Sequence, residues 1–179
     1  MNQTLLTTFA AIAGFLGKSI WDIYWRQKNQ VESLAREKRV DFLERQLSLF
    51  YWPIYLQLQK NNVVWEHLIR GEGFNPTIKN AVDQQLYRTL FLPNHERLVS
   101  IIEANIHLAQ ADPKLEGLLL RLIRHVAIFK ALRELGHERI DPIALGEPWP
   151  TELFPAIEIH LKQIQSEFDQ EIGRRVAAR

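Results

Sequence analysis

The sequence contains no cysteine and only one methionine. The absence of cysteine excludes disulfide bonds, thiolate catalysis and cysteine-ligated zinc. Neither sign of charge dominates, because 22 Lys and Arg are balanced by 21 Asp and Glu, for a formal net charge of +1. Proteins that bind nucleic acid through bulk charge carry an excess of basic residues, so we do not expect nucleic acid as the partner.

The motifs of common catalytic and cofactor sites are also missing. There is no H-E-x-x-H zinc motif and no serine-hydrolase elbow. Gly71-Glu72-Gly73 lacks the later glycine, lysine and serine of a phosphate-binding loop. Glu134 and His137 form half of a carboxylate–histidine motif, whereas a di-iron bundle uses two copies. We therefore expect no cofactor and no metal site, and a protein that is not an enzyme.

Helical patterning fills the chain instead. Hydrophobic residues make up 46% and charged residues 24% of the 179 residues, a globular composition. Apolar residues recur at helical spacing, and no segment shows the alternation of a strand. The sequence predicts an all-α protein with a membrane anchor helix over residues 1–25 and a cytoplasmic domain over 26–179. That domain comprises a long juxtamembrane helix over 26–70 and a bundle over 75–179, about five helices in all.

Prolines, glycines and capping residues divide the predicted helices. Pro53 should kink the first long helix or start a new one. Asn75 should cap a helix with Pro76 at its first position, and this helix should run to about Leu92. Pro93 should break it, with Asn94 capping the next helix. Asp112-Pro113 should start the most hydrophobic helix, which Gly136 should end.

The first predicted helix is close to the limit of what a bilayer accepts. Thr4 to Gly17 carry no charge, but 14 residues of helix reach only about 21 Å of a ~30 Å hydrocarbon core. Extension to Trp25 adds Lys18 and Asp22, each of which costs ~3 kcal/mol near the bilayer centre. The apolar residues return about as much, so a lone helix would insert marginally and a partner helix would help.

The residues after this apolar stretch indicate a membrane boundary. Trp21, Tyr24, Trp25 and Arg26 are typical of a membrane interface. Further basic residues follow, whereas residues 1–3 have none. The positive-inside rule therefore predicts a single-pass protein with its amino terminus outside and its body in the cytoplasm.

Four residues in the anchor recur every four positions and share one helical face: Ala10, Gly14, Lys18 and Asp22. Small residues let helices approach closely, and charges in a spanning helix usually face a bundle interior or a water-filled cavity. This pattern predicts a homo-oligomer or pore face. Three alternatives remain: charges at the headgroup level, a helix lying in the membrane plane, or a buried helix of a soluble protein.

Arginine and histidine occur together in the most apolar predicted helix. Arg121 and His125 are four residues apart and face the same way. One interpretation is a ribonuclease-like Arg/His pair. The other is a buried polar network in which Glu103 or Glu158 on a flanking helix neutralises the guanidinium.

The Pro148-Trp149-Pro150 segment should form a stiff extended loop before a last helix that begins between Thr151 and Pro155. Trp149 is a candidate surface for a soluble protein partner. Alternatively, such an aromatic–proline cluster packs a loop over a helix.

Four segments carry a resemblance to a known group of proteins. They are FYWPIYLQLQKNNVVWEHL at 50–68, NHERLVSIIEANIHLA at 94–109, RLIRHVAIFKALRELG at 121–136 and GEPWPTELFPAIE at 146–158. The chain resembles small, membrane-anchored, all-helical bacterial proteins that have no assigned activity. The resemblance therefore implies an architecture but supplies no catalytic residues.

A second likeness concerns layout alone. One anchor helix followed by a small helical domain is similar to the pore-forming accessory protein of type VI-B CRISPR systems, which has a body like the HEPN ribonuclease fold. HEPN domains carry Arg and His separated by four to six residues. Arg121 and His125 have three residues between them, and Arg88 and His95 have six, interrupted by Pro93 and Asn94.

The leading hypothesis is a membrane-anchored, self-associating helical protein. Its most concrete form is a homo-oligomeric pore or membrane-perturbing effector in antiviral defence, with membrane lipid as its partner. The alternatives are a membrane-tethered HEPN-like ribonuclease, which would use Arg121 and His125 or Arg88 and His95, and a scaffold that docks a soluble protein through Trp149.

Overall fold

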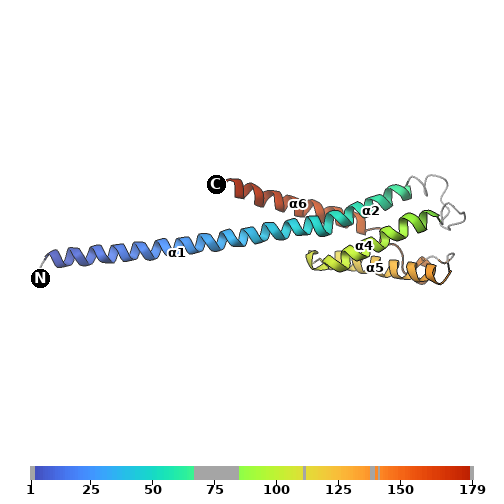
Figure 1. Ribbon diagram of the computed structural model, residues 1–179, viewed down its shortest axis with the longest axis horizontal. Coiled ribbons are helices and arrows are strands. Elements are labelled where there is room, and N and C mark those ends of the chain that lie inside the picture. Colours follow the sequence, from blue (N-terminus) through green and yellow to red (C-terminus); the bar gives the residue numbers. More distant parts are fainter. Residues whose placement is uncertain (1–2, 67–84, 111, 138–139, 141, 178–179) are drawn as a thin grey trace. The chain divides into compact units, whose positions relative to one another are not determined.

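Helices and connecting loops account for every described residue. The computed structural model describes residues 3–66, 85–110, 112–137, 140 and 142–177. No strand occurs in these ranges, which confirms the all-α prediction. Figure 1 shows the elements in chain order.

The chain divides into two units, residues 1–41 and 42–179, and we describe each by itself. The first unit contains most of α1 (Gln3–Arg45), an α-helix of 43 residues without interruption. The predicted domain boundary at residue 25 falls inside this helix. In the part of the chain that the structure describes, no helix combines the length and the apolar character needed to cross a membrane.

The second unit, which we call the body, contains the end of α1 and the remaining elements. Its α-helices are α2 (Trp52–Val64), α4 (Leu92–Asn105), α5 (Pro113–Glu134) and α6 (Leu153–Ala177). Shorter helical turns connect them: η1 (Gln46–Tyr51), η3 (Tyr87–Phe91), η4 (Ile106–Leu108) and η5 (Pro142–Leu145). The body thus has four α-helices within the described residues, whereas about five were expected. Most of the additional helix, expected over 75–92, lies outside the described residues.

The four helices pack around one core. α2 contacts α4 and α6, and α5 contacts the same two helices. The turn η1 touches α4, α6 and η4. Each apolar side chain that becomes fully buried contributes about 1.5–3 kcal/mol. The fully buried set is Phe50, Tyr51, Ile54, Leu98, Ile102, Leu108, Leu115, Leu119, Leu122, Leu153, Ile157 and Ile164.

Pro53 lies in the first turn of a new α-helix, α2, which is one of the two outcomes expected for it, whereas Pro93 does not break the helix as expected. The chain stays helical through η1 into α2 past Pro53, and through η3 into α4 past Pro93. Both η1 and η3 are π-helical turns that end two residues before the proline. A proline ring clashes with the carbonyl four residues earlier and cannot donate to it. The wider π turn moves those carbonyls out of α-helical register, which is how the helix accommodates each ring.

Hydroxyl side chains support both π-helical turns. Ser48 donates to the carbonyl oxygen of Glu44 at 2.7 Å, and Thr89 donates to that of Gln85 at 2.7 Å. A hydroxyl bonded four residues back gives a displaced carbonyl another partner and favours local bending. Asn94, which was expected to cap a new helix after Pro93, instead donates through Nδ2 to Oδ1 of Asn61 on α2 at 3.0 Å.

The ends of α5 agree with the prediction from sequence. Asp112 is the N-cap and accepts a hydrogen bond from the backbone N–H of Lys114 at 2.9 Å, with Pro113 at the first helical position. Gly136 follows the last turn with a φ of 75°, the left-handed conformation that favours glycine at a helix end. The last helix, α6, begins at Leu153, inside the range expected for it.

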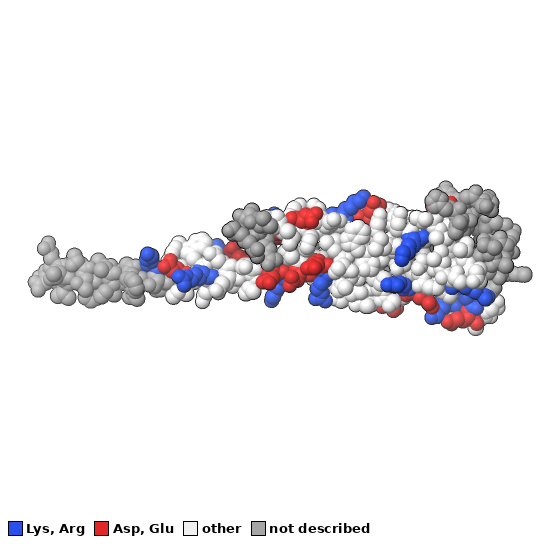
Figure 2. Space-filling model, turned by 45° about the horizontal axis from the view of Figure 1, so that its top comes forward, with Lys and Arg blue, Asp and Glu red and all other residues white. Residues whose placement is uncertain are grey.

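Charged side chains are mixed over the body. The face in Figure 2 shows Lys and Arg interspersed with Asp and Glu, between broad uncharged areas. One of the ion pairs connects neighbouring helices: Lys130 Nζ of α5 lies 2.9 Å from Glu96 Oε1 of α4. Exposed pairs of this kind contribute little to stability, so apolar burial holds the body together.

Candidate functional site

Three residues that the sequence analysis singled out separately meet inside the body. His95 on α4, His125 on α5 and Trp149 in the loop before α6 form one cluster. The His95 imidazole stacks on the Trp149 indole with ring centroids 4.8 Å apart and an interplanar angle of 26°. The His125 ring meets the same indole edge-on at 5.4 Å, and the two imidazole centroids are 6.3 Å apart.

Two phenylalanines complete the enclosure. Phe129 stacks on His125 at 6.3 Å and meets His95 edge-on at 5.9 Å. Phe91 lies 6.2 Å from His95. Only 6% of His95 and 7% of His125 is exposed. The five rings therefore form a buried imidazole–aromatic cluster between α4, α5 and the loop of residues 146–150.

The helical spacing explains how both histidines reach the interior. His95, Leu98 and Ile102 are three and four residues apart, so they share the buried face of α4. His125 lies between Leu122 and Phe129 on the buried face of α5. Prolines on both sides restrict the backbone at Trp149. The signal available in the sequence was one histidine at helical spacing among the apolar residues of each of these two helices.

The loop carrying Trp149 is attached to α5 at two points. His125 donates through Nδ1 to the carbonyl oxygen of Glu147 at 2.8 Å. The Glu147 side chain also pairs with Arg124, with 3.4 Å between Oε2 and Nε. These contacts hold the indole over the histidines, so Trp149 packs the loop onto the helices.

Burial dominates the electrostatics of His95. Desolvation, with a smaller contribution from His125, lowers the pKa of His95 from 6.5 to about 3. Its Nδ1 atom is buried without a hydrogen-bond partner. A general acid or base works best when its pKa lies near the working pH, so His95 is not prepared for proton transfer at neutral pH.

The predicted Arg/His pairs are separated by burial. Arg88 and Arg121 are exposed, whereas His95 and His125 are buried. Imidazoles enclosed by aromatic rings cannot come within hydrogen-bond distance of an RNA phosphodiester. The cluster's geometry therefore does not support the ribonuclease alternative.

The buried network expected around Arg121 is also not what the structure shows. Arg121 and Glu103 are both exposed, and Glu158 pairs with Lys162 of its own helix at 2.7 Å. A guanidinium on a long, flexible side chain can keep its charge in water even beside an apolar face. The structure therefore places His125 inside the body and Arg121 on its surface, and the interpretation of Arg121 as a buried guanidinium was wrong.

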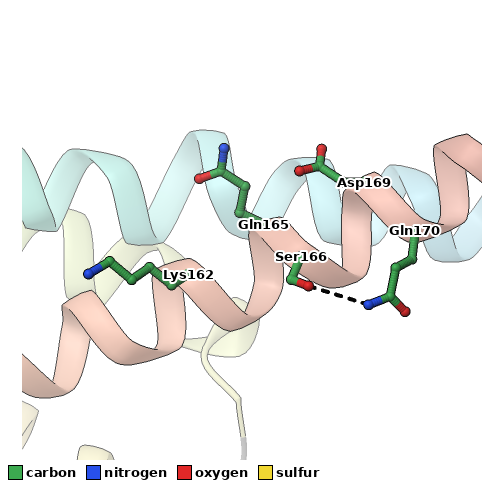
Figure 3. Close-up of a pocket in the computed structure, with 5 residues that line it drawn as sticks. All are labelled: Lys162, Gln165, Ser166, Asp169 and Gln170. Atoms are coloured by element: carbon green, nitrogen blue, oxygen red, sulfur yellow. Dashed lines mark hydrogen bonds between the residues drawn. The ribbon is translucent and has the colours of Figure 1, made fainter.

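Metal-ligating groups do not gather in the described part of the chain. No set of three or more His, Asp or Glu side chains there could hold a metal ion. A shallow, open depression lies on the outer face of α6, lined by Lys162, Gln165, Ser166, Asp169 and Gln170 (Figure 3). Gln170 donates to the Ser166 hydroxyl at 3.3 Å within it. Because it is open and lies along one helix, this depression does not enclose a ligand.

The predicted interface residues of α1 are all on the surface of the first unit. Trp21, Tyr24, Trp25 and Arg26 are exposed. The rings of Trp21 and Trp25 meet edge-on at 5.9 Å, and the Lys28 ammonium lies 5.0 Å from the centre of the Trp25 ring. This arrangement is an exposed aromatic stripe with a cation at its carboxyl-terminal end.

The predicted oligomer face lies along the same helix. Because α1 is α-helical from residue 3 to 45, positions 10, 14, 18 and 22 fall along one side of it. Lys18 and Asp22 are exposed. The side-chain surroundings of Ala10 and Gly14 lie outside what the structure describes.

The comparisons with known proteins add no relative: no family model, curated protein or solved structure matches this chain.

Proposed function

We propose that this chain is a membrane-attached, self-associating helical protein, with α1 as the attachment element and the body as its cytoplasmic part. The observation that carries the proposal is the exposed stripe on α1, where Trp21, Tyr24 and Trp25 are 60%, 59% and 41% exposed. Large aromatic side chains are rarely left in water in such a group. They are enriched where a helix meets the boundary between lipid tails and headgroups.

The residues around the stripe support this placement. The uncharged stretch from Thr4 to Gly17 precedes it, and Arg26 and Lys28 follow it. Lys28 over the Trp25 ring can bind the indole face and an anionic lipid headgroup at the same level. The basic residues that follow the stripe favour a body that remains in the cytoplasm.

Self-association is the second part of the proposal. In a membrane, the face with Ala10, Gly14, Lys18 and Asp22 would let two copies of α1 approach closely and pair Lys18 of one copy with Asp22 of another. A ring of such helices is the pore form of the proposal, in which this face borders the lumen. Release of a dye from vesicles tests the pore form separately from attachment.

Flotation with lipid vesicles tests attachment. The full-length chain should float with vesicles containing 30% anionic lipid, and the variant Trp21→Ala/Tyr24→Ala/Trp25→Ala should lose at least tenfold in bound fraction. A matched control is Val31→Ala/Leu34→Ala, which also removes exposed apolar residues from α1 but outside the stripe. Equal flotation of all three proteins would refute attachment through these aromatic residues.

Native mass in detergent tests self-association. The full-length chain should form a discrete oligomer, and Lys18→Leu/Asp22→Leu should change its size or abolish it. Removal of residues 1–25 should leave a monomeric body. A monomeric full-length chain would refute the self-association, whereas attachment would still stand on the flotation result.

A further inference from the structure

One stretch of the body carries almost no charge, although one side of it is exposed. Residues 46–65 include a single charged residue, Lys60, whereas α5 and α6 each carry charged residues at several exposed positions. A helix that is apolar on all sides is normally buried on all sides. The outward side of η1 and α2 therefore has the composition of a covered surface.

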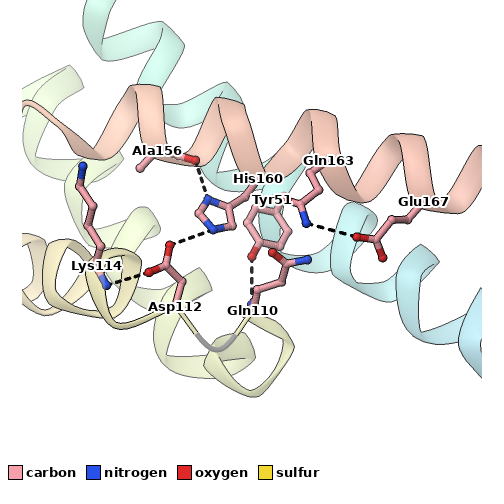
Figure 4. A network of polar contacts seen from close by, with 8 residues as sticks. All are labelled: Tyr51, Gln110, Asp112, Lys114, Ala156, His160, Gln163 and Glu167. Carbon is pink, nitrogen blue, oxygen red and sulfur yellow. Dashed lines mark hydrogen bonds and ion pairs between the residues drawn. The ribbon is translucent and has the colours of Figure 1, made fainter.

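Contacts on the inner side of this stretch fix which side faces solvent. The Tyr51 hydroxyl accepts a hydrogen bond from the backbone N–H of Gln110 at 3.0 Å (Figure 4). The Tyr51 ring stacks parallel to the His160 imidazole of α6, at 6.2 Å and 7°, and Nε2 of His160 lies 3.2 Å from Oδ2 of Asp112. Gln46 donates through Nε2 to a carbonyl oxygen of η4 at 2.7 Å. Together these contacts prevent η1 and the start of α2 from rotating.

The outward side presents a row of side chains at coiled-coil spacing. Trp52, Leu56, Gln59 and Val63 follow one another at intervals of four, three and four residues, so they share one face of α2. All four are exposed, and so is Leu49, one turn earlier in η1. We call these five residues the α2 seam.

The seam is held rigidly and is large enough for an interface. Trp52 meets Tyr55 edge-on at 5.7 Å, and Tyr55 stacks on Phe154 of α6 at 5.4 Å. The apolar residues of the seam are 38–50% exposed and offer roughly 350 Å² of apolar surface, in the range of patches that are often functional. Two such faces with a polar rim would bury about 1,200 Å² in total, the lower end for specific interfaces.

We propose that the α2 seam is an interface with a second copy of this chain, in which two α2 helices pack side by side in parallel. The alternating intervals of four and three residues let a like helix interdigitate, with Leu56 against Leu56 and Val63 against Val63. Because the seam contains no charge, two copies meet without like-charge repulsion. The parallel arrangement rests on the proposed attachment, since copies anchored to one membrane by α1 enter the body from the same side.

A contact of this size is weak by itself. Interfaces near the lower size limit are transient, so the body alone should stay monomeric at micromolar concentration. Attachment of several copies to one membrane raises their effective concentration, as a linker does, and the contact then forms. The polar Gln59 in the seam favours one register at some cost in stability. The seam thus adds a contact between bodies to the one proposed between α1 helices.

The absence of cysteine makes disulfide cross-linking a direct measurement of this contact. The full-length variants Leu56→Cys and Val63→Cys, oxidised on vesicles containing 30% anionic lipid, should form disulfide-linked dimers at least tenfold faster than Leu120→Cys. The control position on α5 is 52% exposed, against 50% for Leu56. A mixture of Leu49→Cys and Val63→Cys should show no preference for the mixed dimer, because such a preference requires antiparallel helices and would overturn the parallel arrangement.

A charge placed in the seam provides a second test. Leu56→Lys should slow the cross-linking of Val63→Cys at least tenfold, because two lysines would then face each other. Gln59→Lys, at a position that is already polar and exposed, should do the same without any loss of apolar packing. Leu120→Lys should leave the rate unchanged, and thermal unfolding should show that all three variants are folded. Unchanged rates in both seam variants would contradict the proposal.

Cross-linking in detergent at ~1 mM protein repeats the measurement without a membrane. Equal rates for Leu56→Cys and Leu120→Cys in both settings would mean that a second copy does not cover the seam, even if the chain floats with vesicles. Faster cross-linking of Leu56→Cys in detergent by a chain that does not float would support the contact and refute the attachment alone. The two proposals therefore fail separately.

Discussion

The His95 imidazole stacks on the Trp149 indole with ring centroids 4.8 Å apart, and only 6% of His95 is exposed, so a proton on this ring would place a charge in a buried, apolar site. Two residues 54 positions apart in the sequence thus form one packing unit between α4 and the loop before α6. The first two predictions below follow from this unit, and the other two from the core and the helix ends.

Acid should destabilise the body through His95. The pKa of His95 is about 3 in the folded chain and 6.5 when unfolded, so the unfolded state binds the extra proton between these values. The stabilisation is complete above pH 6.5 and is lost as the pH falls towards 3, by roughly 4–5 kcal/mol in total and about 2 kcal/mol by pH 5. Urea unfolding of the wild type and of His95→Phe from pH 7.5 to 4.5 measures this loss of stability.

Between pH 7.5 and 4.5, His95→Phe should take up about one proton fewer on unfolding than the wild type does. The exposed His107 provides the control, since His107→Gln should keep the wild-type slope. An unchanged slope in His95→Phe would mean that His95 is not held neutral by burial.

Trp149→Ala should cost about 2–3 kcal/mol, because it removes a half-buried ring from two imidazoles and leaves a cavity beside them. Trp149→Phe, which keeps a ring in place, should cost less than half as much. Equilibrium unfolding in urea provides both values. If the two variants were equally stable, the stacking would not contribute as the geometry implies.

Neighbouring positions of α5 provide a direct test of the core. Leu122 is completely buried and Leu120 is 52% exposed. Leu122→Ala should destabilise the body by about 2–5 kcal/mol, and Leu120→Ala by no more than about 0.5 kcal/mol. Thermal and urea unfolding should rank them in this order, and the reverse order would place the wrong face of α5 inside.

Two glycines of the same helix region should respond to alanine with opposite signs. Gly136 has a φ of 75°, so Gly136→Ala should cost about 1 kcal/mol from backbone strain. Gly117 lies within α5 with open space where the methyl group of an alanine would stand, so Gly117→Ala should stabilise by about 0.5–1 kcal/mol. A comparison of unfolding midpoints measures both changes, and destabilisation by Gly117→Ala would contradict the open space seen there.

Local rules predicted the ends of α5 correctly, because a cap such as Asp112 and a terminal glycine such as Gly136 act within a few residues. The same rules were wrong at Pro93, where the helix was expected to break. A proline disrupts the hydrogen bonds of an α-helix, but whether the chain can widen into a π turn depends on the burial of its neighbours, among them Phe91.

The candidate site was predicted only in pieces. His95, His125 and Trp149 were each noted, yet nothing in a single helix shows that three segments meet. Arg121 was placed inside because its neighbours in sequence are apolar, although a long side chain can reach solvent. His160 and its contact with Asp112 were missed entirely, since the pair depends on how α6 lies against the start of α5.

The π-helical turns before Pro53 and Pro93 have a consequence for the length of the chain at these two places. A π turn holds one more residue than an α-helical turn of the same height, so each acts as a single-codon insertion that the helix has absorbed. Loss of one residue from 46–51 would therefore return that turn to α-helical geometry without changing the register of the helix on either side. The Pro53 ring would then meet the carbonyl four residues before it, so the extra residue is what lets a proline stand inside a continuous helix.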